Sequence, residues 1–119
     1  MRRVLFKVKR WIDGKWVFGD LLQYQDGSAS IHSYLHGCRV SDSVDPSTVC
    51  EYTGFYDRKG MEIFENDTVQ VLLYGDLIKS HVTFSDGMFK LFGVSLAAWA
   101  KDKHYCEVIG NFNDEKEYK

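Results

Sequence analysis

Short apolar or alternating segments recur about every eight to twelve residues along this chain, and turn signals separate them. Most of these signals are residue pairs that contain glycine, at positions 13–14, 26–27, 59–60, 75–76 and 86–87. This spacing is typical of a small β-barrel or sandwich, because a helix needs a longer uninterrupted run. An aromatic content of 15% also favours strands. The sequence therefore predicts a mostly β fold rather than an α/β fold.

Two hairpins are predicted near the N-terminus. Residues 4–12 alternate and turn at 13–14 into a strand at 16–18, and segments 21–24 and 29–35 flank a second turn. Residues 38–49 are rich in Ser and Asp, so they are predicted to form a loop with one helical turn beginning at Pro46. We place the boundary here, with an N-terminal β lobe over residues 1–43 and a small barrel over residues 44–119.

The second part is predicted to contain six further strands. They cover residues 52–55, 61–64, 68–74, 77–84, 88–92 and 105–112. Residues 96–103 favour a short helix, or else an irregular strand, and the polar tail 113–119 is expected to fray.

Charge is distributed unevenly, although the net charge is only −2. Residues 1–15 hold six cations and one carboxylate, a local +5, whereas residues 41–67 hold seven carboxylates and two cations, a local −5. The two stretches are expected to be solvated faces, or to meet within one subunit or across an oligomer interface.

The first strand carries the candidate interface. Its outward face is predicted to hold Lys7, Lys9 and Trp11, with Lys15 and Trp16 beyond the turn. Interleaved basic and aromatic side chains on a small β fold can follow a phosphate backbone and stack bases. The alternative is contact with a second subunit, because edge strands readily pair with copies of themselves.

The His and Cys residues do not predict a metal site or a catalytic thiol. His32 and His36 are four apart, which on a strand separates them by roughly 13 Å, too far to bind one ion. Cys106 and His104 would point to opposite faces of a strand. We expect no metal, no cofactor, no catalytic residue and three reduced, buried and inert thiols.

Four carboxylates lie close together in the sequence: Asp57, Glu62, Glu65 and Asp67. A metal-dependent hydrolase would need several carboxylates on one face, so this cluster leaves that activity as a remote alternative. The favoured interpretation is structural, because short Asp side chains in turns accept hydrogen bonds from nearby backbone amides.

Several segments resemble the YopX family of phage and prophage proteins. They read VDPSTV at 44–49, YTG at 52–54, DRKGMEIFEND at 57–67 and EVIGN at 107–111. The resemblance implies an SH3-like barrel with an added N-terminal β-hairpin lobe, a phage setting and structural turns at Gly54, Gly60, Asn66 and Asp67. It implies no catalytic residues, because the family's function is not established. Asn66 replaces the family's usual glycine, which predicts a positive φ at this position.

A cytoplasmic protein is expected. The apolar stretch after the first three residues is too short for an export signal, and no run is long enough to cross a bilayer. The predicted function is a non-enzymatic binding or assembly module that forms a homo-oligomer and binds a phage or host protein, with no membrane contact. The alternative is a nucleic-acid-binding accessory protein that uses the N-terminal strand.

Overall fold

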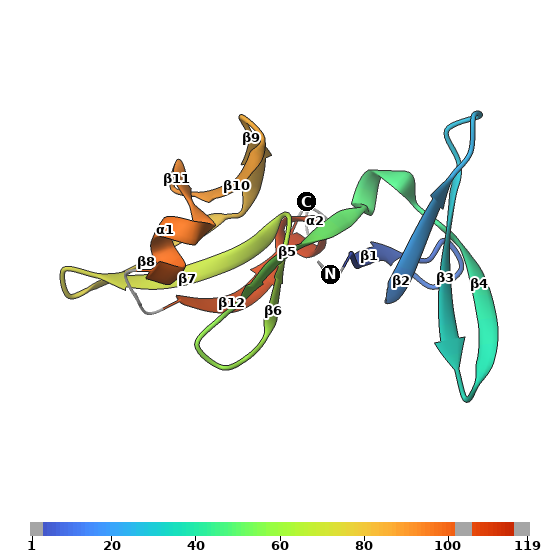
Figure 1. The fold of residues 1–119 in the computed structure, drawn as a ribbon, viewed down its shortest axis with the longest axis horizontal. Coiled ribbons are helices and arrows are strands. Elements are labelled where there is room, and N and C mark those ends of the chain that lie inside the picture. The colour runs from blue at the N-terminus through green and yellow to red at the C-terminus, as the bar shows by residue number, and fades with distance from the viewer. Residues whose placement is uncertain (1–3, 102–105, 116–119) are drawn as a thin grey trace. The chain divides into compact units, whose positions relative to one another are not determined.

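The computed structural model describes residues 4–101 and 106–115. The fold is mostly β, as predicted. The chain divides into two compact units, residues 1–52 and residues 53–119 (Figure 1). In the described part of the chain, no helix is long and apolar enough to cross a membrane.

The first unit is an antiparallel sheet. Its elements are β1 (Phe6–Lys9), β2 (Trp16–Gln23), β3 (Ala29–Leu35), β4 (Cys38–Val44), the 3-10 helix η1 (Pro46–Thr48) and the start of β5 (Cys50–Tyr56). The strand order is β4-β3-β2-β1, with β5 beside β1. Strand β2 is shared between two partners, because its first half pairs with β1 and its second half pairs with β3.

One face of this sheet forms the core of the first unit. The buried residues are Val8, Ala29, Ile31 and Val44, with Val49 packed against them. These positions follow the two-residue period of their strands, which places alternate side chains on one face. Val44 and Val49 belong to this core, although the sequence-based boundary places them in the second part.

The prediction of a loop over residues 38–44 is wrong, because this segment is strand β4. A two-residue turn at His36 and Gly37, with φ of 52° and 80°, returns the chain directly alongside β3. The Ser and Asp residues of β4 are compatible with a strand at the sheet edge, where polar side chains face water. The helical turn at Pro46 is confirmed, with the Asp45 side chain accepting from the Ser47 N–H.

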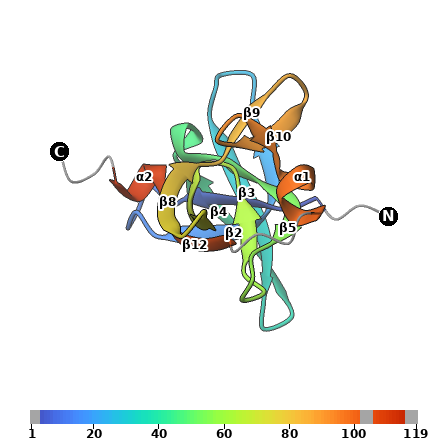
Figure 2. The same ribbon diagram turned by 90° about the vertical axis from the view of Figure 1, so that its left-hand side faces the viewer.

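The second unit contains two three-stranded sheets. Its elements are β6 (Glu62–Phe64), β7 (Asp67–Leu73), β8 (Asp76–His81), β9 (Thr83–Ser85), β10 (Met88–Leu91), β11 (Val94–Ser95), α1 (Leu96–Lys101), β12 (Cys106–Asn111) and α2 (Phe112–Glu115). The sheets are ordered β12-β7-β8 and β11-β10-β9, and β6 lies beside β5 (Figure 1). Strands β9 and β10 lie side by side, with α1 next to β10 (Figure 2). The short helix is confirmed over residues 96–101, whereas positions 102–105 lie outside the described residues.

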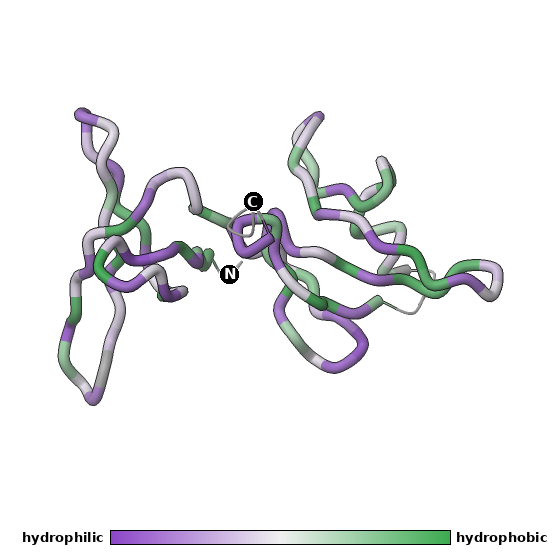
Figure 3. The backbone as a smooth tube through the Cα atoms, turned by 180° about the vertical axis from the view of Figure 1, so that it is seen from behind, coloured by the Kyte–Doolittle hydropathy of each residue, from purple (hydrophilic) through white to green (hydrophobic). Residues whose placement is uncertain are grey.

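The core of the second unit lies where α1 packs against the strands. Its buried residues are Ile63, Val69, Val71, Val82, Leu91 and Leu96. Hydrophobic residues also continue along the β7–β8 hairpin toward its turn (Figure 3). Leu72 and Leu77 of this hairpin are exposed. The described strands do not close into a barrel, so the SH3-like barrel is not confirmed.

The expected fraying of the tail is wrong for residues 113–115, which belong to α2. The Glu115 carboxylate accepts from the Thr68 hydroxyl at 2.8 Å and pairs with His81 Nε2 at 2.6 Å. These hydrogen bonds, with His81 the larger cause, hold the pKa of Glu115 below its usual value. Asn113 is buried as well. Residues 116–119 lie outside the described part of the chain.

The three thiols differ in exposure. Cys50 is buried and Cys106 is partly buried, but Cys38 is exposed, so the prediction of buried thiols is wrong for Cys38. Cys38 is the first residue of β4, directly after the turn at His36 and Gly37, and β4 is the edge strand of its sheet. Burial, and secondarily the Asp57 carboxylate, raises the pKa of the Cys106 thiol to about 11.

We expect one thiol of the native protein to react quickly with a disulfide reagent and two to react slowly. Cys38 is the fast one, because access controls thiol exchange and a raised pKa lowers the thiolate fraction of Cys106. A colorimetric thiol titration with and without denaturant measures this, and Cys38→Ser should remove the fast phase alone. Fast reaction of all three native thiols would contradict the burial of Cys50.

Candidate functional site

Three of the four turn residues implied by the family resemblance have left-handed backbones, but Gly54 lies within strand β5 and not in a turn. The φ angles are 89° at Gly54, 82° at Gly60 and 69° at Asn66. The prediction for Asn66 is therefore confirmed. Asparagine tolerates this region better than other side-chain residues, so the turn before β7 keeps its shape without a glycine.

Asp67 and Asp57 are structural carboxylates. Asp67 is 0% exposed and accepts from the Phe64 N–H at 2.7 Å and from Asn111 Nδ2 at 2.9 Å. Asp57 is also buried, and it accepts three backbone N–H groups, one of them from Val108 on β12. Both carboxylates accept backbone N–H groups near them in the chain, as the structural interpretation predicts. Both also join the 57–67 segment to β12, which that interpretation did not predict.

Two possible metal sites were considered from the sequence, the His32 and His36 pair and the carboxylate cluster, and neither is assembled among residues 4–101 and 106–115. No group of three or more His, Cys, Asp or Glu side chains there is placed to hold an ion. His32 lies on β3 and His36 lies in the turn that follows, as the sequence predicts. The His32 imidazole instead contacts the Ser30 hydroxyl at 3.2 Å. His104 falls outside the described residues.

Three of the five candidate interface residues pack against one another on the sheet. Lys9 lies opposite Trp16 across β1 and β2, and the ammonium groups of Lys7 and Lys9 lie 4.9 and 5.4 Å from the Trp16 ring centre. Lys9 is only 4% exposed. Cation–π contact therefore engages these side chains within the first unit.

Trp11 and Lys15 lie apart from that cluster, in a loop between β1 and β2. Strand β1 covers Phe6–Lys9, so the predicted strand over residues 4–12 begins two residues too early and ends three residues too late. Residues 10–15 form what we call the hairpin loop. At its tip Trp11 is 62% exposed and Ile12 is 88% exposed.

Hydrogen bonds brace the hairpin loop at its base. The Arg10 N–H donates to the Lys15 carbonyl and the Gly14 N–H donates to the Arg10 carbonyl, each at 2.9 Å. Asp13 accepts from the Lys15 N–H and from the Arg10 guanidinium. The Trp11 N–H donates to the Ser43 carbonyl of β4 at 3.2 Å. The loop therefore presents two large apolar side chains from a fixed backbone.

Arg10 also links the basic and acidic stretches of the chain. Its guanidinium contacts Asp13 and lies 3.7 Å from Asp42 on β4. The hydrogen bond from Arg10, followed by that from the Lys15 backbone, lowers the pKa of Asp13. One contact between the +5 and −5 stretches thus forms inside the first unit.

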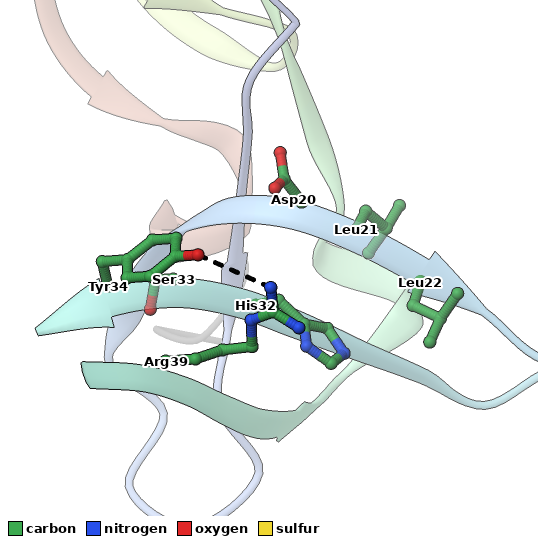
Figure 4. Close-up of a pocket in the computed structure, with 7 residues that line it drawn as sticks. All are labelled: Asp20, Leu21, Leu22, His32, Ser33, Tyr34 and Arg39. Atoms are coloured by element: carbon green, nitrogen blue, oxygen red, sulfur yellow. Dashed lines mark hydrogen bonds between the residues drawn. The ribbon is translucent and has the colours of Figure 1, made fainter. Parts of the chain in front are cut away.

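A second feature of the first unit is a groove of about 350 Å³ over β2, β3 and β4 (Figure 4). Its lining side chains belong to Asp20, Leu21, Leu22, His32, Ser33, Tyr34 and Arg39. Arg39 donates to the Tyr34 hydroxyl at 3.5 Å, and its guanidinium lies 6.0 Å from the Tyr34 ring centre. Tyr34 is 72% exposed. We call this feature the β2–β4 groove.

The sequence interpretation missed this groove because it treated residues 38–44 as a loop. The signal was present in His36-Gly37, since a two-residue turn pairs the flanking residues in strict register. That register places Arg39 opposite Tyr34 and Ser41 opposite His32. Alternation along β3 then places His32 and Tyr34 on one face.

The fold and these surfaces define a two-unit, mostly β protein with buried carboxylates at its turns and an exposed hairpin loop. The chain belongs to the YopX family, whose model, described as YopX protein, matches residues 5–117. No curated protein matches the chain. No solved structure matches it either.

Proposed function

We propose that this protein is a non-enzymatic binding and assembly module that forms a homo-oligomer and binds a phage or host protein in the cytoplasm. The observation that carries the proposal is the braced hairpin loop, with Trp11 and Ile12 exposed at its tip. YopX family membership supports the phage setting. The buried carboxylates of the second unit hold that part of the fold together.

Tryptophan is enriched among the residues that dominate protein interfaces. A loop that is already fixed by hydrogen bonds loses little conformational freedom when it binds. The hairpin loop also carries the exposed cation Lys15, and residues 41–67 of a second copy offer partly exposed carboxylates such as Asp45 and Glu51. Two apolar side chains with an exposed cation beside them fit contact with a second copy of this chain.

The nucleic-acid alternative has weaker support. Lys9 is buried and Lys7 and Lys9 both lie over Trp16, so two of the three proposed phosphate-binding lysines are already engaged. Few phosphate contacts remain for the N-terminal strand, and non-specific binding at physiological salt depends on their number.

We expect light scattering on a sizing column, at tens of micromolar protein, to give a multiple of the 13.8 kDa chain mass. The double variant Trp11→Ala, Ile12→Ala should shift the mass toward 13.8 kDa, because hot-spot truncations cost about 2 kcal/mol or more, roughly thirtyfold in affinity. Leu77→Ala, an exposed apolar residue of the second unit, is the matched control. A wild-type protein that runs as a single 13.8 kDa species would overturn the proposal.

A further inference from the structure

The β2–β4 groove holds two charged side chains that no described residue neutralises. Within residues 4–101 and 106–115, the Arg39 guanidinium has the Tyr34 side chain as its one polar partner, and the Asp20 carboxylate makes no hydrogen bond or ion pair. By contrast, Arg10 in the same unit contacts two carboxylates. A guanidinium and a carboxylate that line one groove without pairing leave their hydrogen-bonding capacity for a ligand.

The arrangement of the groove is dipolar (Figure 4). Arg39 lies on β4 at one side, beside the Tyr34 hydroxyl, whereas Asp20 lies on β2 at the other side. His32 lies opposite Asp20 on the strand between them, and Leu22 supplies an apolar wall. A ligand that fits must present an oxyanion to β4, an N–H donor to β2 and an apolar group to Leu22, which lies two residues beyond Asp20 on β2.

We propose that the β2–β4 groove binds the carboxyl-terminal end of an extended peptide. The planar guanidinium of Arg39 matches a carboxylate in two parallel hydrogen bonds, and the Tyr34 hydroxyl can donate a third. Asp20 accepts a backbone N–H further along the peptide, and Leu22, two residues beyond Asp20 on β2, contacts the apolar side chain of the third residue from the end. The distance from β4 to β2 is two strand spacings, about 10 Å, which is the length of about three extended residues. The groove therefore contacts the last three residues of the peptide.

Asp20 argues against a nucleic-acid strand as the occupant. An oligonucleotide carries one negative charge at each phosphate, so a strand that places one phosphate on Arg39 brings its neighbours near the Asp20 carboxylate. Like charges held close together in this way oppose binding. A peptide terminus carries its negative charge at one end only, which suits a groove with opposite charges at its two sides.

The test is calorimetric titration of the full chain with acetyl-Leu-Ala-Ala, once with a free carboxylate and once as the amide. We expect the acid to bind and the amide to bind at least about tenfold more weakly, because a charge-assisted hydrogen bond contributes about 1.5–3 kcal/mol. Arg39→Gln should weaken the acid about tenfold, and Asp20→Asn should weaken it less. Lys79→Gln, an exposed cation of the second unit, should leave binding unchanged.

Equal binding of acid and amide, no binding of either, or full affinity in Arg39→Gln would overturn the proposal, provided that circular dichroism shows a folded variant. A single-stranded oligonucleotide that binds more tightly than the peptide and loses binding in Arg39→Gln would reassign the groove to phosphate and would also overturn it. Peptide binding does not depend on self-association. The Trp11→Ala, Ile12→Ala variant should therefore bind the acid normally, which separates this proposal from the assembly proposal.

Discussion

Replacement of Asp67 by Ala is expected to lower the free energy of unfolding by about 3 kcal/mol. The change leaves the Phe64 N–H and Asn111 Nδ2 without their buried acceptor, and each unsatisfied buried donor costs about 1–3 kcal/mol. Removal of the buried carboxylate's own desolvation penalty offsets part of this loss. The Asn111 amide in turn accepts from the Asn113 N–H, so the start of α2 should loosen as well.

Urea unfolding followed by circular dichroism measures this effect. Asp76→Ala is the control, because Asp76 is an exposed carboxylate on the neighbouring strand β8. Surface substitutions of that kind change stability by about 0.5 kcal/mol or less. If the two variants lost the same small amount of stability, Asp67 would not be the buried acceptor that joins β7 to β12.

Gly19→Ala is the second substitution with a large expected effect. A Cβ atom at Gly19 would lie 2.2 Å from the His32 carbonyl oxygen, a backbone atom of β3. The backbone there has φ of 156°, at the point where β2 stops pairing with β1 and starts pairing with β3. The strands must separate to admit the methyl group, and overpacking of this kind costs about 1–3 kcal/mol.

The melting temperature of Gly19→Ala should therefore fall, by roughly 4–8 °C for each kcal/mol lost in a unit of this size. Gly110→Ala is the control, because its added Cβ meets nothing closer than the Glu115 side chain at 4.0 Å. A Gly19→Ala protein that melts with the wild type would show that β2 and β3 are further apart than the structure places them.

The sequence predicted most strands because their turns contain glycine or asparagine in positions that need a positive φ. Asn66 is the clearest case. It stands where the YopX family usually has a glycine, and this replacement correctly predicted a positive φ. The roles of Asp57 and Asp67 were predicted as well, because short acidic side chains in turns accept backbone hydrogen bonds. Their partners on β12, some fifty residues away, could not be deduced from local patterns.

The candidate surfaces were less predictable. Alternation over residues 4–12 could not show that β1 ends at Lys9, because that depends on the hydrogen bonds that close the hairpin loop. Likewise, the burial of Lys9 follows from its position opposite Trp16 and from its backbone bond to Thr48. The sequence shows that these residues are basic and aromatic. Only the strand pairing shows that Lys9 is buried against Trp16, whereas Trp11 is exposed.

Hydroxyl-radical footprinting at increasing protein concentration tests the central claim most directly, namely that the hairpin loop is the surface through which the protein assembles. Mass spectrometry of peptides reports the oxidation of Trp11 and Ile12, and Tyr74, which is 95% exposed in the second unit, is the internal control. The account predicts that oxidation of Trp11 and Ile12 falls as the oligomer forms, while oxidation of Tyr74 stays constant. Oxidation of Trp11 that stays constant at concentrations where the oligomer is present would contradict it.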